Sequence, residues 1–347
     1  MNAPRFLKQK NMLRVLYGLA PVACGGVYFF GWRVAALLAV SLLPGFLTEW
    51  FMVSRRNGKV SYACFVTASL YALSLPPTTP FWIAAVGIVV AILFGKEVFG
   101  GFGKNVFNPA IVGRAFVYVC FPVELTSRFV PVFRGFPGGL IHWSYRTAME
   151  GSADAVTAAT PMWAFRDYGF VTPVKDLFLG TIGTTFDFRG AQTVLSAGSA
   201  GEISVVLVLL GGIYLLWTKT AKWQLTLSTL AGALTAAVFF RYGLGADNVP
   251  PPLFSLFSGG LVYAAVYMVT DPVSAPKLKL SQWIYGAFIG IMIVFFRFKS
   301  IFAGGVGFSI LMGNMIAPSL DLWIKRIRER KRASRSSVDT SAAKAGA

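Results

Sequence analysis

Charged residues are scarce in this sequence. Asp, Glu, Lys and Arg make up only 13% of its 347 residues, whereas 55% are hydrophobic and the mean hydropathy is +0.63. A soluble domain contains about a quarter charged residues. The composition therefore excludes an ordinary soluble protein and indicates a polytopic membrane protein.

Histidine and cysteine are nearly absent as well. The single His142 argues against a histidine-based metal site or proton relay, and the three cysteines have no C-x-x-C spacing. We interpret the cysteines as small core residues and expect no metal site. The first apolar run follows four basic residues without a cleavage site, so we expect a transmembrane helix there.

Acidic residues number 14 against 32 basic ones, which gives a formal net charge of +18. Such a charge raises nucleic acid as a partner. The basic residues, however, lie in short clusters between apolar runs, as they do in cytoplasmic loops of membrane proteins. We therefore expect no nucleic-acid partner.

Ten apolar runs are long enough to be candidate membrane spans. They divide the chain into a first membrane half (1–122), a long loop (123–200), a second membrane half (201–324) and a basic, disordered cytoplasmic tail (325–347). The fifth run starts at Asn108-Pro109 and contains Arg114, so a re-entrant segment is an alternative there. The predicted spans are 15–31, 33–53, 60–76, 80–95, 106–122, 203–217, 223–241, 252–270, 281–297 and 302–323.

The distribution of Lys and Arg predicts the orientation. With ten spans both termini share one side, and the termini and short loops of that side carry twenty-one Lys and Arg against four in the short loops opposite. Positive residues favour the cytoplasmic side. Both termini are therefore predicted to be cytoplasmic, and the charge-balanced loop 123–200 is predicted to lie on the outer face.

The two halves show traces of a repeat. Tyr71, Pro76 and Pro80 at the end of the third run have the same spacing as Tyr267, Pro272 and Pro276 at the end of the eighth. Glycine triplets also precede the fifth run and open the tenth. An odd number of spans per half makes such a repeat inverted. We predict an all-α polytopic membrane protein of about ten transmembrane helices, arranged as two five-helix inverted repeats.

A few acidic residues lie close to the predicted spans. Ionisable groups inside a bilayer are costly and often mark an ion path, so Glu49, Glu97 and Asp271 are candidates for one. Interfacial solvation is the alternative for Glu49, and capping of a helix break is the alternative for Asp271.

The stretch Ser152–Pro161 is small, polar and turn-prone within this apolar chain. Thr160 lacks a neighbouring base, and a hydroxyl without a base is a poor nucleophile. These residues therefore argue against an autonomous hydrolase. A threonine modified by a separate transferase fits better, because the acceptor needs only an accessible loop.

Residues 154–160 resemble the D-x-x-[S/T]-[G/A]-A-T flavinylation motif, in which a flavin transferase joins FMN through its phosphate to the last threonine. The resemblance implies covalent FMN on Thr160, with Asp154, Thr157 and Ala159 as motif residues. Ala158 replaces the commoner glycine.

Longer segments resemble the NqrB/RnfD family: Gly95–Phe116, Thr270–Pro276, Gly201-Glu202 and the region of Asn314 and Pro318. The Gly-rich run 95–113 lacks the spacing of a phosphate-binding loop, and its residues alone leave helix packing and ligand contact both open. The resemblance places Gly100, Gly101, Lys104 and Asn105 near a quinone or flavin.

The resemblance implies a membrane subunit of an ion-translocating redox complex in the bacterial inner membrane. Its expected partners are other membrane and peripheral subunits, the flavin transferase, quinone, and Na⁺ or H⁺. We expect a subunit that relays electrons through FMN toward quinone, with coupled Na⁺ transport. A second, non-covalent flavin (riboflavin or FMN) is left open. The alternatives are the RnfD-type member of the family and, more remotely, a secondary transporter without covalent flavin.

Overall fold

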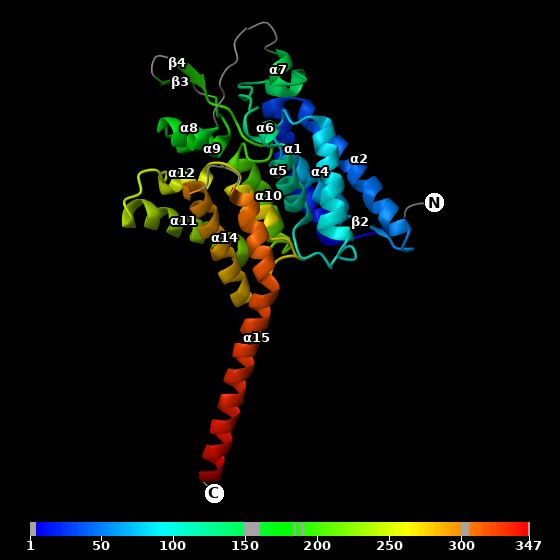
Figure 1. The fold of residues 1–347 in the computed structure, drawn as a ribbon, viewed down its shortest axis with the longest axis vertical. Coiled ribbons are helices and arrows are strands. Elements are labelled where there is room, and N and C mark those ends of the chain that lie inside the picture. The colour runs from blue at the N-terminus through cyan, green and yellow to red at the C-terminus, as the bar shows by residue number, and fades with distance from the viewer. Residues whose placement is uncertain (1–4, 149–159, 184, 189–190, 300–304, 346–347) are drawn as a thin grey trace.

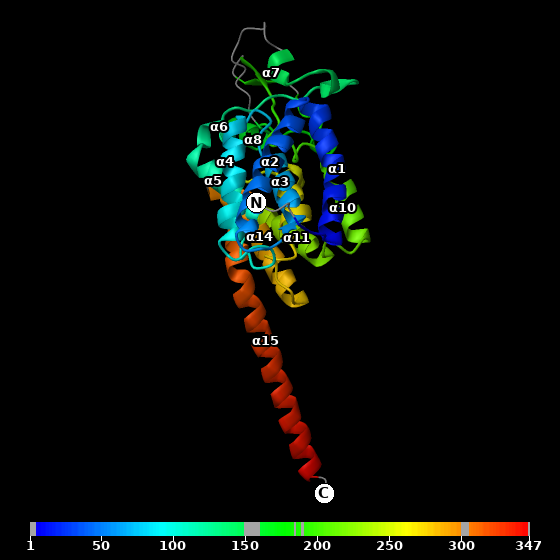
Figure 2. The ribbon, with the colours of Figure 1, turned by 90° about the vertical axis from the view of Figure 1, so that its right-hand side faces the viewer.

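The computed structural model describes residues 5–148, 160–183, 185–188, 191–299 and 305–345. Its helices pack into one bundle, and the described residues between the two groups of long helices gather over one end of it (Figure 1). We call this the loop end. The last helix leaves the opposite end, the tail end, and extends away from the bundle in both views (Figures 1 and 2).

The first five predicted spans all correspond to helices. These are α1 (Lys10–Phe30), α2 (Arg33–Ser54), α3 (Ala63–Leu73), α4 (Phe81–Ile92) continued by the π-helix η1 (Leu93–Glu97), and α5 (Pro109–Cys120). Asn108 caps α5, because its side-chain oxygen accepts a hydrogen bond from the Ala110 backbone N–H at 3.0 Å and Pro109 occupies the first turn, where no N–H is needed.

The second group agrees with the prediction except in one helix. It comprises α10 (Val205–Trp217), α11 (Trp223–Val238) with the π-helix η3 (Phe239–Gly243), α12 (Pro252–Phe257), α13 (Leu261–Tyr263) with the π-helix η4 (Ala264–Met268), α14 (Lys279–Lys299) and α15 (Gly305–Ala345). The predicted continuous span 252–270 is wrong. It breaks at Ser258–Gly260, where Gly259 has φ +61°, a conformation that ends a helix.

Within the described residues, five helices are long and apolar enough to cross a membrane, and α3, α5 and α10 are shorter apolar helices. The five are Lys10–Phe30, Arg33–Ser54, Trp223–Gly243, Lys279–Lys299 and Gly305–Lys331. The chain is thus a largely helical, polytopic membrane protein. Where a disordered tail was predicted from residue 325, α15 continues to Ala345.

The loop end is built from short elements: α6 (Pro122–Thr126), the 3-10 helix η2 (Gly138–Ile141), α7 (Tyr145–Ala148), α8 (Pro161–Tyr168), α9 (Val174–Leu179), and the strands β3 (Thr185–Phe188) and β4 (Ala191–Val194). The two strands form an antiparallel hairpin. At the tail end β1 (Phe6–Leu7) pairs in parallel with β2 (Val60–Ser61). The all-α prediction misses these two short sheets.

Small residues let α11 and α14 approach closely. A methyl group placed on Gly290 would lie 2.1 Å from the Thr229 carbonyl oxygen, and one on Gly232 would lie 2.5 Å from the Ala287 carbonyl oxygen. Such close backbone contact replaces the hydrophobic driving force that helices lack in lipid.

Replacing Gly290 with alanine should therefore destabilise the chain. The expected loss is about 1–3 kcal/mol of unfolding free energy, because rigid backbone must move. Unfolding in mixed micelles measures it. Gly307→Ala is the matched control, since its nearest neighbour would lie 3.8 Å away. Equal stability of the two variants would contradict the packing described here.

Candidate functional site

Thr160 starts helix α8 at the loop end. Its backbone is extended, its carbonyl accepts the Ala164 N–H at 2.8 Å, and its hydroxyl makes no capping hydrogen bond. Pro161 in the first turn and the left-handed Gly169 after the last turn fix both ends of this short helix. The Thr160 side chain is only 8% exposed. The prediction of a threonine freely exposed on a loop is therefore wrong for the folded chain.

Contacts with the second group of helices hold α8 in place. The Ser258 hydroxyl donates to the Met162 sulfur at 2.9 Å, and the rings of Phe165 and Phe254 lie 5.8 Å apart. Both partners on the second group belong to α12 or to the break that follows it. The break in the eighth span thus creates the surface on which Thr160 is positioned.

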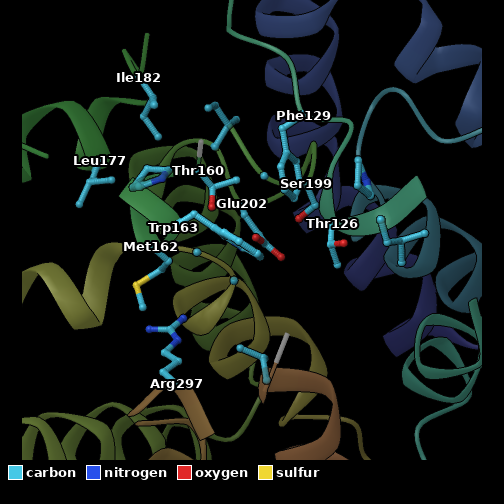
Figure 3. A pocket seen from close by; sticks show the side chains of 18 of the residues that line it. Thr126, Phe129, Thr160, Met162, Trp163, Leu177, Ile182, Ser199, Glu202 and Arg297 are labelled. Atoms are coloured by element: carbon cyan, nitrogen blue, oxygen red, sulfur yellow. The ribbon is translucent and has the colours of Figure 1, made fainter. Parts of the chain in front are cut away.

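Thr160 lies on the wall of a cavity between α5, α8, the end of α12 and residues 198–203. The space amounts to about 930 Å³, including the part that is open to solvent. Figure 3 shows Thr160 and Trp163 on one side of this space, with Met162 and Arg297 below them. Phe129, Ser199 and Thr126 lie on the opposite side, and Glu202 lies between the two sides. Phe129, Phe257 and Tyr118 add aromatic rings to the wall. We call it the loop-end cavity.

An ion pair forms part of its polar lining. Arg114 from α5 donates from Nη1 to Glu202 Oε1 at 3.1 Å. A methyl group on Gly260 would lie 2.4 Å from the same Oε1, and one on Gly198 would lie 3.3 Å from Oε2. Glycine at these two positions makes room for the carboxylate. The pair explains how Arg114 is accommodated in an apolar helix.

Arg297 is a second, half-buried cation beside the cavity. Its Nη1 and Nη2 donate to the carbonyls of Ser255 and Ser258 at 2.6 and 3.0 Å, at the C-terminus of α12. Its Nε and the Ser199 hydroxyl, both buried, have no hydrogen-bond partner in the described part of the chain. Unpaired buried polar atoms in a cavity wall are costly unless a ligand or water completes them. The cavity therefore suits a ligand with an aromatic plane and hydrogen-bonding edges.

A separate cavity at the tail end brings together two other predicted residues, Asn105 and Asp271. Lys96, Asn108 and Tyr267 also line it. It shares the side chains of Met12, Phe102, Pro272 and Val273 with a wider adjoining cavity. We call the two together the tail-end cavity. Ser274 donates from both its backbone N–H and its hydroxyl to Asp271 Oδ2, so Asp271 caps the turn after η4.

The remaining predicted residues lie in different places. Gly100 and Gly101 have φ values of +105° and +94° and form the turn after η1, but neither they nor the exposed Lys104 line the tail-end cavity. Asp154, Thr157 and Ala159 lie outside the described residues.

The candidate ion-path residues Glu49 and Glu97 lie in one buried cluster near the tail end. Lys96 Nζ is 2.5 Å from Glu49 Oε2. The Ser61 N–H and hydroxyl both donate to Glu49 Oε1 at 2.8 Å, and Lys96 donates to the Ser61 hydroxyl. Among the described residues no group of three or more His, Cys, Asp or Glu side chains is suited to a metal.

Sequence reasoning missed several of these residues. The charge count places Lys96 in a cytoplasmic loop and Arg297 among the four basic residues of the opposite loops. In the structure Lys96 is buried, Arg297 is half-buried, and both are hydrogen-bonded. The signal for Lys96 was its place directly before Glu97 inside an apolar run, where a solvated lysine is unexpected. Nothing in the sequence marks Ser199 or Trp163.

The fold and the loop-end cavity define a polytopic membrane protein with a partly polar cavity at one end of its bundle. A model of the NQR2, RnfD, RnfE family matches residues 5–329, and the chain belongs to that family.

Curated relatives include both branches of the family. The chain is 32% identical over 317 residues to the B subunit of the Na(+)-translocating NADH-quinone reductase of Azotobacter vinelandii, covering 90% of this chain and 70% of the relative. It is 33% identical over 333 residues to the D subunit of the ion-translocating oxidoreductase complex of Shewanella amazonensis, covering 91% of each. The B subunit of the Neisseria meningitidis serogroup A reductase is 30% identical, covering 92% and 72%.

Proposed function

We propose that this chain is the membrane subunit of an ion-translocating redox complex, and that it relays electrons toward quinone through FMN bound covalently to Thr160, with coupled Na⁺ transport. One observation carries the proposal. The terminal threonine of the flavinylation-like segment lies on the wall of the loop-end cavity, and its hydroxyl is not used for helix capping. The names of the relatives support the redox and ion-transport parts.

The residues around Thr160 fit a flavin. Trp163, Phe129 and Phe257 offer rings for stacking, while Ser199 Oγ and Arg297 Nε lack other partners among the described residues. A bound flavin would supply electron transfer, and the protein would set its position and electrostatic surroundings. Arg297 and the Arg114–Glu202 pair would hold fixed charges close to it.

Burial of Thr160 limits when the transferase acts. An 8% exposed side chain on a cavity wall leaves little room for a second enzyme. We infer that FMN is attached before α8 packs against α12.

The arrangement in the membrane is part of the proposal. We propose ten membrane segments in two inverted five-helix halves, in a bacterial inner membrane. The third and eighth segments are short or broken, as in folds with inverted repeats. Both termini would be cytoplasmic, which puts the loop end and Thr160 on the outer face and the tail end on the inner face.

The tail-end cavity is the proposed place for quinone or a second, non-covalent flavin (riboflavin or FMN). Phe102 offers an aromatic face there, and Asn105 and Asn108 offer amides. The predicted residues Gly100, Gly101 and Lys104 would then contribute indirectly, because they shape the turn that positions Phe102. Other subunits of the complex and the flavin transferase remain proposed partners.

Two alternatives differ in what they predict. An RnfD-type chain would carry the same flavin in a different complex, and the Shewanella D subunit and the Azotobacter B subunit are about equally similar to this chain, at 33% and 32% identity. A secondary transporter would carry no covalent flavin.

Thr160→Val should abolish covalent flavin. Valine keeps the shape of threonine but removes the only oxygen that can accept the phosphodiester. After expression with the flavin transferase, the wild-type band should fluoresce under ultraviolet light in a denaturing gel and the variant band should not.

Thr172→Val is the matched control. Thr172 is buried, and its hydroxyl has no partner among the described residues, so the same substitution should leave the fluorescence intact. A dark wild-type band from a host that expresses the transferase would refute the covalent-flavin proposal.

A further inference from the structure

Glu49 and Glu97 lie in the same buried cluster, but their carboxylates differ in how many hydrogen-bond and ion-pair partners they have. Glu49 Oε2 is paired with Lys96 Nζ, and Glu49 Oε1 accepts two hydrogen bonds from Ser61. Its charge is balanced and its oxygens are occupied. Although Glu49 is a sequence-based candidate for an ion path, the geometry leaves it no free oxygen for a second cation.

Glu97 is 1% exposed, and neither of its carboxylate oxygens accepts a hydrogen bond within the described residues. The nearest cation is Arg56, whose Nη1 lies 3.5 Å from Oε2. Arg56 directs its one close hydrogen bond, at 2.9 Å, to the Glu97 backbone carbonyl instead. A buried carboxylate without donors is strongly unfavourable unless a cation or proton completes it.

The turn after η1 passes close to this carboxylate. Gly101 has φ +94°, and a methyl group on it would be in van der Waals contact with both Glu97 oxygens, at 3.8 Å. A larger side chain at this position would crowd the carboxylate. Glu97 is also the last residue of the continuous helix α4–η1, where the helix dipole favours positive charge.

We propose that the Glu97 carboxylate is a binding site for Na⁺ and that Arg56 is a tethered cation that covers it from the solvent side. Carboxylate and carbonyl oxygens at the C-terminal ends of interrupted helices are typical ligands for Na⁺ in membrane proteins. The Arg56 side chain is 41% exposed, so it can turn toward water at little cost when Na⁺ enters. This inference rests on the proposed ion transport and names a residue for it.

Binding of radiolabelled Na⁺ to the full chain in nanodiscs tests the proposal. Choline chloride keeps the ionic strength constant, and KCl serves as the competitor. Wild type should bind Na⁺ saturably. Glu97→Gln should weaken binding at least about tenfold, because it removes the charge and keeps the shape. Arg56→Gln should tighten binding about three- to tenfold, because it removes the competing cation.

Two variants guard against misfolding. Glu97→Asp keeps the charge on a shorter side chain and should bind Na⁺ more weakly than wild type but better than Glu97→Gln. Glu329→Gln makes the same chemical change at an exposed position on α15 and should bind like wild type.

Three results would overturn the inference: wild-type binding in Glu97→Gln, unchanged affinity in Arg56→Gln, or an infrared band of a protonated carboxylic acid that persists in saturating Na⁺ and disappears in Glu97→Gln. The last result would assign a proton to Glu97. Binding is measured without turnover, and Thr160→Val should bind Na⁺ normally, so failure of the flavin proposal and failure of this one are distinguishable.

Discussion

Lys96→Met should be among the most destabilising single substitutions in this chain. Methionine keeps the length of the side chain but leaves the Glu49 carboxylate, 1% exposed, without its cation. Breaking a buried ion pair from one side costs about 3–5 kcal/mol of unfolding free energy. Unfolding of the purified chain in mixed micelles should show a loss of this order.

The double variant Glu49→Gln/Lys96→Met separates the lost charge from lost packing. Glutamine still offers an oxygen to the Ser61 N–H and hydroxyl, which donate to Glu49 Oε1 in the wild type. With both charges removed, most of the stability should return, since a neutral pair of similar volume avoids the desolvation cost. An additive loss in the double variant would contradict the pairing seen here.

Much of the fold follows from hydrophobic run length. Long apolar stretches have few alternatives to a helix, because backbone groups in lipid must be satisfied internally. The sequence therefore predicts α1, α2 and α14 to within a few residues. The same rule fails at Ser258–Gly260. There Arg297 donates hydrogen bonds to the carbonyls that the helix break leaves without a partner, although it lies 39 residues from Ser258 in the sequence. Such a tertiary contact cannot be predicted from a local sequence pattern.

The candidate site, like the fold, could be predicted from the sequence only in part. The motif around Thr160 predicts where a modification would occur, because local sequence is what a transferase recognises. It does not predict that Thr160 faces a cavity with Arg297 and Ser199, since those residues reach it only through the packing of α8 on α12. Likewise, the sequence identifies both Glu49 and Glu97 as candidates, because acidic residues are rare in the predicted spans. Only the hydrogen-bond and ion-pair partners of each carboxylate oxygen show that Glu49 is paired and that Glu97 accepts no hydrogen bond within the described residues.

The Arg114–Glu202 pair gives the second large expected effect. Arg114→Met should leave the Glu202 carboxylate, 10% exposed, facing the loop-end cavity without a charge partner. The cost should approach the lower end of the range for a broken buried pair, about 3 kcal/mol, because the Arg114 side chain is itself 22% exposed and water reaches part of the site.

The double variant Arg114→Met/Glu202→Gln should recover most of this loss in the same unfolding experiment. A separate readout follows from the position of Glu202 on the cavity wall that carries Thr160. If FMN occupies this cavity, the emission spectrum of the folded, flavinylated chain should differ between Arg114→Met and wild type, while fluorescence in a denaturing gel should be equal. An unchanged spectrum in a destabilised Arg114→Met chain would mean that the pair supports the junction of α5 with residues 198–203 but lies away from the flavin.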